Sequence, residues 1–435
     1  MNILLVAHHC NPDWGSEPLI GFKWFRELQL RANVTLVTHV RNRESLERSG
    51  HVRGQVHYID TERTSSMINR MNDAIWPATA VVNRLALEAI SQDRFDKRAF
   101  EFARGLCARK QIDLIHRVSP ISPRYPSRLA SLPVPFIMGP LNGGMEMPPG
   151  FEEIALKERA YFHWIRSFTR ILEWLRPTLT RSTRILVARK GMQGIPESVR
   201  DRWVSFCENG VDPGSFSSTP SNNNGCLKLL SLGRLLPYKG VDMLLAAVAR
   251  LPNELNWSLE IVGDGTERLN LEQRVRELNL ETHVQFHGAV PVSDAPKWFN
   301  ACDIFCMPSV RESGGAVVLE AMAAGKPVIV ANHGGPAETV NDEVGIRIPV
   351  TNRETLIHGF SRAISELAAD PRRRLALGAA GRRLIEAEYT WGVKADRIVR
   401  LYQDVLHEEA ARCALQSPRV YSDDRQRNDR RTAKV

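Results

Sequence analysis

The chain has 435 residues, which is long enough for two or three domains. Its hydrophobic fraction of 43% and mean hydropathy of −0.26 are typical of a soluble globular protein, and no run of 18 apolar residues predicts a transmembrane helix. The seven scattered cysteines favour reduced thiols over a disulfide framework. The formal net charge of +9 leaves nucleic acid, an anionic membrane surface and polyanionic substrates open as partners.

The first part of the chain has the pattern of an α/β domain. Asn2 to Ala7 is an apolar run that predicts a buried strand, and the polar residues after it argue against a signal peptide. A loop with Gly15 follows, then an amphipathic helix over Leu19 to Arg31 and a strand over Val34 to Thr38. This order predicts a doubly wound α/β domain, although no dinucleotide fingerprint is present.

Two further strands are predicted in this half, over Ile112 to Val118 and Pro135 to Gly139. The strand ends and the loops after them carry the candidate residues Gly15, His116, Gly143, Gly144 and Glu146. Glu17 and Glu146 follow glycine turns and are weaker candidates. This half therefore has its own strand-end loops, where ligands of α/β proteins bind.

Residues 152–190 form a basic stretch with aromatic residues interleaved. Nine basic and four acidic residues give it a net charge of +5. One interpretation is that the stretch lies on an anionic membrane surface. The other, which we favour, is a helix packed on its own domain with its arginines in water, because aromatic residues at helical spacing usually belong to a core.

Residues 213–225 are rich in Ser, Asn, Pro and Gly and form the clearest linker of the chain. A second alternation of strands and helices follows it. The predicted domains are a first domain over residues 1–212, the linker over 213–225, a second domain over 226–388, a final helix over 389–410 and a mobile basic tail over 411–435.

The stretch from Ile304 to Val340 is the most informative part of the sequence. It predicts a buried strand over Ile304 to Met307, a loop ending in two glycines, a helix over Ala316 to Ala324 and a second strand over Val328 to Ala331. Gly325 stands where a helix C-cap belongs. A glycine-rich loop at the carboxyl edge of a parallel sheet, before a helix N-terminus, is a place where anionic ligands bind.

Two carboxylates frame this loop. Glu312 precedes Gly314 and Gly315, and Glu320 follows them inside the helix, with seven residues between the two glutamates. Carboxylates accept hydrogen bonds from hydroxyl groups well, as on a ribose diol or a sugar. The glycines let the backbone approach a ligand closely.

A second loop, from Gly233 to Gly240, follows a strand predicted over Leu227 to Leu232. It carries Arg234 and Lys239, which together can neutralise a diphosphate. It is not a Walker A loop, since no G-K-[ST] is present. No D-x-D motif is placed to hold a metal ion beside a diphosphate, so we expect metal-independent chemistry without a cofactor.

The segment RESGGAVVLEAMAAGKPVI, with its E-x7-E pair, resembles the retaining family-4 glycosyltransferases of the GT-B fold, also known as glycosyl transferases group 1. The resemblance is most specific in the second half of the chain. In the first half it relies on GSEP, DLIH and GPLNGG. One departure is Ser313, at a position where many members carry a residue such as Phe before a single glycine.

The resemblance implies two Rossmann-like domains facing each other across a cleft, with a C-terminal helix that returns to the first domain. It implies a nucleotide sugar on the second domain, a glycan, lipid-linked or small-molecule hydroxyl acceptor on the first, and transfer with retention of configuration. Arg234 and Lys239 would contact the donor diphosphate, and Glu320 would hold the ribose. Glu312 would orient the sugar and stabilise charge.

For the remaining candidates the resemblance implies positions beside the ligand. His116 would face the cleft near the transferred sugar as a catalytic residue, and Gly263 and His287 would approach the nucleotide base. Gly15, Gly314 and Gly315 would approach the donor with their backbones. We expect a cytoplasmic protein without a nucleic-acid partner, with peripheral contact at the inner face of the membrane left open.

Two other classes of function remain open. The charge of +9 also fits a membrane-surface or nucleic-acid binding protein, which would need neither Glu312 nor Glu320. A sugar-nucleotide epimerase or a glycan phosphorylase would share the fold. A phosphorylase needs a pyridoxal phosphate lysine, which the sequence does not identify.

Overall fold

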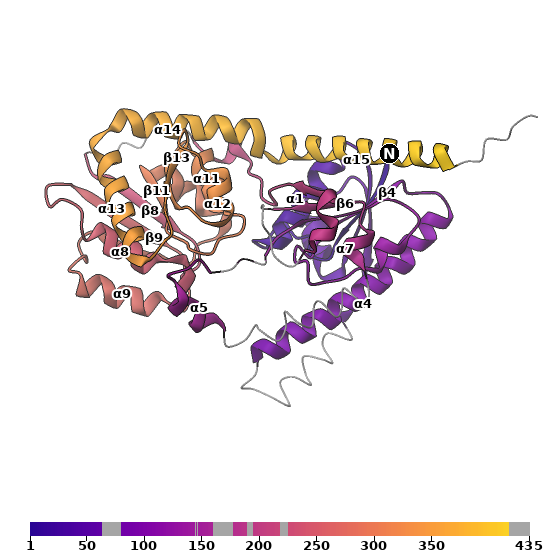
Figure 1. Cartoon of the computed structure of the whole chain (residues 1–435), viewed down its shortest axis with the longest axis horizontal. Helices are drawn as coiled ribbons and strands as arrows, with labels where there is room; N and C mark the ends of the chain where they lie inside the picture. Colours follow the sequence, from indigo (N-terminus) through magenta and orange to yellow (C-terminus); the bar gives the residue numbers. More distant parts are fainter. Residues whose placement is uncertain are drawn as a thin grey trace, which may run out of the picture.

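The computed structural model describes residues 1–62, 80–143, 145, 147–159, 177–188, 195–217 and 225–416. It contains two α/β domains that lie side by side, with the last helices running along both (Figure 1). Each domain has a parallel β-sheet between layers of helices. The predicted fold of two doubly wound domains is therefore confirmed.

The first domain is built on a seven-stranded parallel sheet in the order β3-β2-β1-β4-β5-β6-β7. The strands are β1 (Asn2–Ala7), β2 (Asn33–His39), β3 (Gln55–Ile59), β4 (Leu114–Ser119), β5 (Phe136–Leu141), β6 (Arg184–Val187) and β7 (Trp203–Ser205). Alternate residues of β1 enter two different cores. Ile3 and Leu5 pack with α1 (Glu17–Leu28) and the last helix, whereas Leu4 and Val6 pack with α4 (Ala80–Ala108).

The second domain repeats this plan with a six-stranded parallel sheet in the order β10-β9-β8-β11-β12-β13. The strands are β8 (Leu227–Leu232), β9 (Trp257–Val262), β10 (Val284–Gly288), β11 (Ile304–Met307), β12 (Val328–Ala331) and β13 (Gly345–Ile348). One face is covered by α8 (Val241–Val248), α9 (Arg268–Glu277) and α13 (Arg353–Ala369), and the other by α10 (Ala295–Ala301) and α11 (Ala316–Ala323). The strand order reverses between β8 and β11, which is where ligands bind in such sheets.

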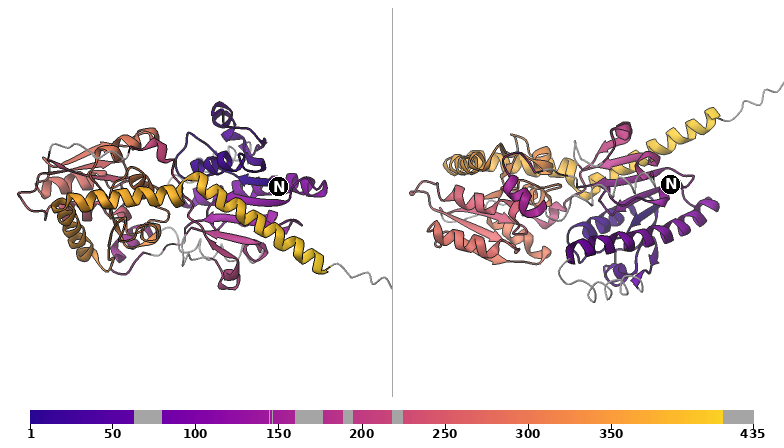
Figure 2. Two further views of the ribbon diagram at one scale, coloured as in Figure 1. Left: turned by 90° about the horizontal axis from the view of Figure 1, so that it is seen from above. Right: turned by 60° about the horizontal axis from the view of Figure 1, so that its bottom comes forward.

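The last helices join the two domains. Helix α14 (Pro371–Leu384) packs on the second domain, a π-helical turn spans Ile385–Tyr389, and α15 (Trp391–Gln416) lies against α1 of the first domain (Figure 2). The expected return of the last helix is thus confirmed. It is longer than predicted, because residues 411–416, expected in the tail, are helical. The rest of the predicted tail lies outside the described residues.

A segment of the first half of the sequence crosses to the second domain. After β5 the chain reaches Phe151, which is buried in the core of the second domain, with Met147 and Ile154 packed against that core. Helix α5 (Glu152–Arg159) lies against the second domain beside α9 (Figure 1). We call residues 147–159 the strap. The predicted assignment of all residues up to 212 to the first domain is wrong for the strap.

The basic stretch expected over 152–190 is described only at its ends. Residues 160–176, 189 and 190 lie outside the described ranges, so the expectation of a membrane contact there stays a prediction. Among the helices that the structure does describe, none combines the length and apolar character needed to span a membrane.

Candidate active site

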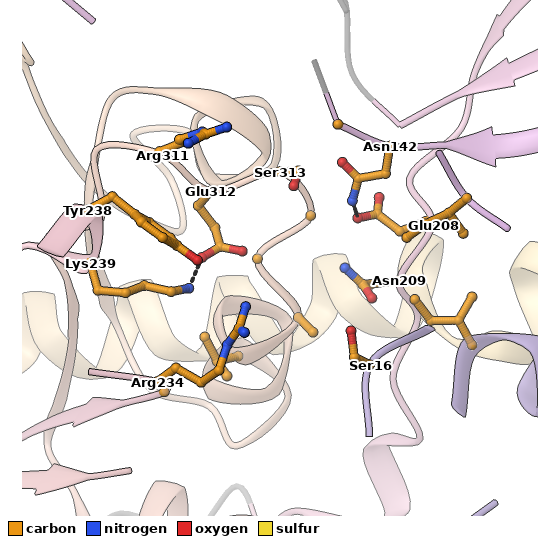
Figure 3. A pocket seen from close by; sticks show the side chains of 18 of the residues that line it. Ser16, Asn142, Glu208, Asn209, Arg234, Tyr238, Lys239, Arg311, Glu312 and Ser313 are labelled. Atoms are coloured by element: carbon orange, nitrogen blue, oxygen red, sulfur yellow. Dashed lines mark hydrogen bonds and ion pairs between the residues drawn. The ribbon is translucent and has the colours of Figure 1, made fainter. Parts of the chain in front are cut away.

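A cavity of about 440 Å³ lies between the two domains (Figure 3). The second domain lines it with the loops that follow β8 and β11, the strands at which the sheet order reverses. The first domain lines it with Ser16, Ile20, Ile121, Asn142, Gly143, Glu208 and Asn209. A cleft at a domain interface and outside the carboxyl ends of parallel strands is where α/β enzymes bind small molecules.

The loop from Gly233 to Gly240 brings two cations to the cavity. Arg234 is exposed and Lys239 is half-buried, and both line the cavity wall. Gly240 has a φ of 68°, and a Cβ there would lie 2.5 Å from the carbonyl oxygen of Pro308. Only glycine fits this left-handed, crowded position, from which α8 begins. The loop is therefore held closely against the end of β11.

The loop that carries Glu312 is held by a second pair of glycines. The amide N of Gly335 donates to the carbonyl oxygen of Glu312 at 3.0 Å. A Cβ on Gly335 would overlap the carbonyl oxygen of Ser313. Gly334 and Gly335 begin α12 (Gly334–Thr339), and these glycines let the start of that helix approach the Glu312 loop. Gly315, at φ 59°, then starts α11.

Lys239 and Glu312 form an ion pair across the cavity wall (Figure 3). Their side chains are 19% and 18% exposed, so the pair is only partly screened by water. Arg234 and Arg311 line the same cavity, which gives this side of it a net positive charge. Such a wall suits a ligand that brings two or more negative charges.

Glu320 is placed differently from Glu312. It lies on α11, outside the residues that line the cavity, and burial raises its pKa to about 7. The structure shows no hydrogen-bond partner for its carboxylate among the described residues. The Glu320 carboxylate, which lacks a partner among the described residues, can therefore accept hydrogen bonds from a ligand.

The first domain contributes a polar wall. The side-chain amide of Asn142 donates to Oε1 of Glu208, and Asn209 lies beside them (Figure 3). Glu208 is buried, which raises its pKa to about 7. A Cβ on Gly314 would overlap the side chains of Glu208 and Asn209, so the two domains touch at this point.

The prediction that His116 faces the cleft is wrong. Its side chain is fully buried, and both ring nitrogens are hydrogen-bonded: Nδ1 to the hydroxyl of Tyr402 at 2.5 Å and Nε2 to the carbonyl oxygen of Gly139 at 2.7 Å. Burial lowers its pKa to about 4, so the ring is neutral at ordinary pH. His116 is a structural residue and does not line the cavity.

Three other predicted residues are also outside the cavity lining. His287 lies on β10, where Nε2 contacts Oε2 of Glu260 at 2.6 Å and the ring packs against Trp298 of α10. Gly263 is needed for packing, since a Cβ there would overlap the carbonyl oxygen of Gly233. Gly15 is exposed and only its neighbour Ser16 lines the cavity.

The remaining candidates of the first half differ in their positions. Oε1 of Glu17 accepts from the backbone amide of Ile121 at 3.3 Å, so this glutamate supports a lining loop. Gly143 lines the cavity. Gly144 and Glu146 lie outside the described residues.

The sequence analysis missed Asn142, Glu208 and Asn209. Asn142 directly precedes Gly143, and Asn209 directly precedes Gly210, so both positions carried the Asn-Gly signal of a turn. Nothing in the spacing marked Glu208. Within the described ranges, no group of three or more His, Cys, Asp or Glu side chains is arranged to hold a metal ion.

Part of the chain matches a known family of proteins. Residues 218–384 match the family model of glycosyl transferases group 1. A GDP-mannose-dependent alpha-(1-6)-phosphatidylinositol monomannoside mannosyltransferase of Mycolicibacterium smegmatis is 34% identical over 210 residues, which cover 44% of this chain and 54% of that protein. The lipopolysaccharide core biosynthesis glycosyltransferase LpsE of Rhizobium meliloti is 33% identical over 174 residues, 40% of this chain and 48% of the relative. The matches thus span about half of these relatives.

The fold is shared over nearly the whole chain. The structure of Anabaena HepE in complex with UDP and glucose matches with a TM-score of 0.61 at 17% identity, over 93% of this chain and all of that one. The glycosyltransferase WaaG, involved in lipopolysaccharide biosynthesis, matches with a TM-score of 0.56 at 16% identity, over 91% of this chain and 98% of that one. These likenesses establish the same two-domain architecture.

Proposed function

The chain carries a glycosyl transferases group 1 domain in a GT-B fold, and from that premise we propose that it is a retaining, metal-independent glycosyltransferase. It would move a sugar from a nucleotide-sugar donor to a hydroxyl of a glycan, a lipid-linked glycan or a small molecule. One observation carries the proposal: the cavity between the domains combines Arg234, Lys239 and Glu312 on one wall with a polar wall from the first domain.

The donor diphosphate would bind between Arg234, Lys239 and the N-terminus of α11. The first amides of a helix lack partners within the helix and attract anions. Lys239 is engaged with Glu312 in this structure, so the phosphates would compete with that carboxylate for the ammonium group. As Lys239 moves to the phosphates, Glu312 becomes available to hydroxyl groups of the sugar and to positive charge at its anomeric carbon.

The ribose of the donor would bind Glu320. A ribose diol can donate two hydrogen bonds to one carboxylate, and the Glu320 carboxylate has no partner among the described residues. Gly314 has no Cβ, and this lets the side chains of Glu208 and Asn209 approach the loop between the two glutamates. This arrangement needs no metal ion to neutralise the diphosphate.

The choice of donor follows from the relatives. The Mycolicibacterium relative is named for GDP-mannose, and HepE was solved with UDP and glucose. We therefore put GDP-mannose first and UDP-glucose second. Relatives named for phosphatidylinositol mannosides and lipopolysaccharide core favour a cell-envelope acceptor, reached from the cytoplasm.

The test measures turnover of a panel of nucleotide sugars by the full chain. Water serves as the acceptor in place of the unidentified hydroxyl compound. Release of a nucleoside diphosphate and free sugar is expected from one donor. Proton NMR during the first minutes should show the α-anomer from an α-linked donor, which reports retention. Conversion of the donor into an isomer would instead reveal an epimerase. Tight binding of vesicles or nucleic acid without any turnover would favour the binding-protein alternative.

A further inference from the structure

Glu208 is the one titratable side chain that the first domain contributes to the described lining of the cavity. It follows β7, in the segment that leads towards the second domain. Only 1% of its surface is exposed. Oε1 accepts from Asn142, whereas Oε2 is buried and has no hydrogen-bond partner among the described residues. Buried polar atoms without a partner are rare, and at the wall of a cavity they suggest a place for a ligand group.

The position of Glu208 is fixed from two sides. On the side of the second domain, its carboxylate touches Gly314, two residues after Glu312. On the other side the segment packs on α15, where a Cβ on Gly210 would lie 2.8 Å from the Trp391 ring. The carboxylate is therefore held directly opposite the loop on which the proposed function places the transferred sugar.

The charges around Glu208 come from several elements. Lys394 of α15 is buried and donates to the carbonyl oxygen of Cys207, and its ammonium lies 4.3 Å from the centre of the Phe206 ring. Its charge favours the ionised form of Glu208, while Glu312 across the cavity opposes it. The Asn142 amide, at the end of β5, is uncharged. Burial outweighs these effects and raises the pKa of Glu208 to about 7.

We infer that Glu208 is a catalytic residue that binds the attacking hydroxyl through Oε2 and takes its proton during transfer. The bond from the anomeric carbon to the diphosphate breaks, and its electron pair leaves with the diphosphate. The hydroxyl oxygen forms the new bond to that carbon, and its proton passes to Oε2. The resulting carboxylic acid returns the proton to water after the products leave. This step relies on the proposed function, and the rival is deprotonation by the leaving diphosphate.

A general base works best when its pKa is near the working pH, and such groups contribute about 100-fold or more to rate. Glu208 meets this condition, and its orphan oxygen is where a hydroxyl would bind. Glu208→Gln keeps the shape and the hydrogen bond with Asn142 but cannot take a proton. Glu254→Gln, at an exposed position of the second domain, is the matched control.

The experiment measures release of nucleoside diphosphate from GDP-mannose and UDP-glucose between pH 5.5 and 8.5, with water as acceptor. Wild type and Glu254→Gln should show a rate that rises through about pH 7. Glu208→Gln should be slower by about 100-fold or more at pH 8 and lack this rise, with unchanged affinity for the nucleoside diphosphate by calorimetry. If Glu208→Gln has the same pH profile as wild type, the proton goes to the diphosphate. That result would overturn the inference about Glu208 and leave the proposed function standing.

A second measurement needs no donor. Because the folded-state pKa of Glu208 is raised, its protonated form stabilises the fold at low pH, and this stabilisation is lost as pH rises through about 7. The melting temperature of Glu208→Gln relative to wild type should therefore increase between pH 5.5 and 8.5. A constant difference would mean that Glu208 does not titrate there and would overturn the inference. If wild type shows neither turnover nor nucleotide binding, both the proposed function and the inference about Glu208 are wrong.

Discussion

Tyr402 of the last helix donates a hydrogen bond to Nδ1 of His116, in the central strand β4 of the first domain. The direction follows from the other ring nitrogen: Nε2 faces the carbonyl oxygen of Gly139, which can only accept, so Nε2 carries the hydrogen. Both partners are fully buried. The histidine expected to act on substrate instead fixes the helix that connects the two domains.

Replacing Tyr402 by Phe tests this anchor. The change removes the donor and leaves Nδ1 of His116 buried without a partner, so the free energy of unfolding should fall by about 1–3 kcal/mol. Urea unfolding measures it. Affinity for the nucleoside diphosphate should be unchanged, because His116 lies outside the cavity lining. If the Tyr402→Phe variant lost donor affinity without losing stability, His116 would have to be assigned to the binding site.

The Glu312→Gln variant should separate binding from turnover. In the structure Glu312 holds Lys239, so its loss frees the lysine for phosphate. Affinity for the nucleoside diphosphate should be equal or higher by calorimetry, while turnover falls, because Glu312 acts on charge that develops in the transition state. A parallel loss of both would mean that Glu312 serves ground-state binding only.

The Glu320→Gln variant should fail in the opposite way. Losing a charged hydrogen bond to the ribose should weaken donor binding by about 1–3 kcal/mol, with a smaller effect on turnover at saturation. Since burial raises the pKa of Glu320 to about 7, wild type loses stability as pH rises towards 7, because the carboxyl ionises in the unfolded state before it does in the folded state. The variant should therefore gain stability relative to wild type as pH rises from 5 to 8. Wild-type donor affinity in this variant would refute the assignment to ribose.

Gly335→Ala tests the support of the Glu312 loop. The added methyl group would overlap the carbonyl oxygen of Ser313 and push the loop away from α12. We expect a loss of roughly 1–3 kcal/mol in stability from overpacking, together with weaker donor binding. Gly214→Ala is the control, since no atom of the described residues lies within 4 Å of a Cβ there. Equal donor affinity in the two variants would show that the loop tolerates displacement.

Turnover should survive an excess of EDTA, because Arg234 and Lys239 supply the positive charge for the leaving diphosphate. The measurement is nucleoside diphosphate release before and after chelation. Inactivation by EDTA that is reversed by magnesium or manganese would contradict this prediction. Lys239→Met should then be compared, and a large loss of turnover is expected with or without metal.

The sequence predicted the second domain better than the first. The bounds of β8, β11 and β12 agree with the structure because buried parallel strands are short apolar runs between turn residues. Strands β3 and β6 were missed. The first, Gln55–Ile59, is a half-buried edge strand with polar residues, and the second, Arg184–Val187, is only four residues long.

The candidate site was predicted in part for a physical reason. Loops with glycines at fixed offsets fix the backbone locally, so Arg234, Lys239, Glu312, Gly314 and Gly315 could be placed at one cavity. Whether a strand-end side chain such as His116 or His287 faces a cleft depends on contacts with distant elements. Tyr402 and Glu260 decide these two cases, and neither is visible from local spacing.

The strap and the last helix mean that the two domains are not separable modules. Residues 226–388 expressed alone would lack Phe151, whose ring fills their core, and residues 1–212 alone would lack Trp391 and Tyr402. Each half would expose to water the apolar surface that the missing residues cover, and it would tend to aggregate. A functional hybrid between this chain and a relative should therefore exchange the second domain together with its strap, while α15 stays with the first domain on which it packs.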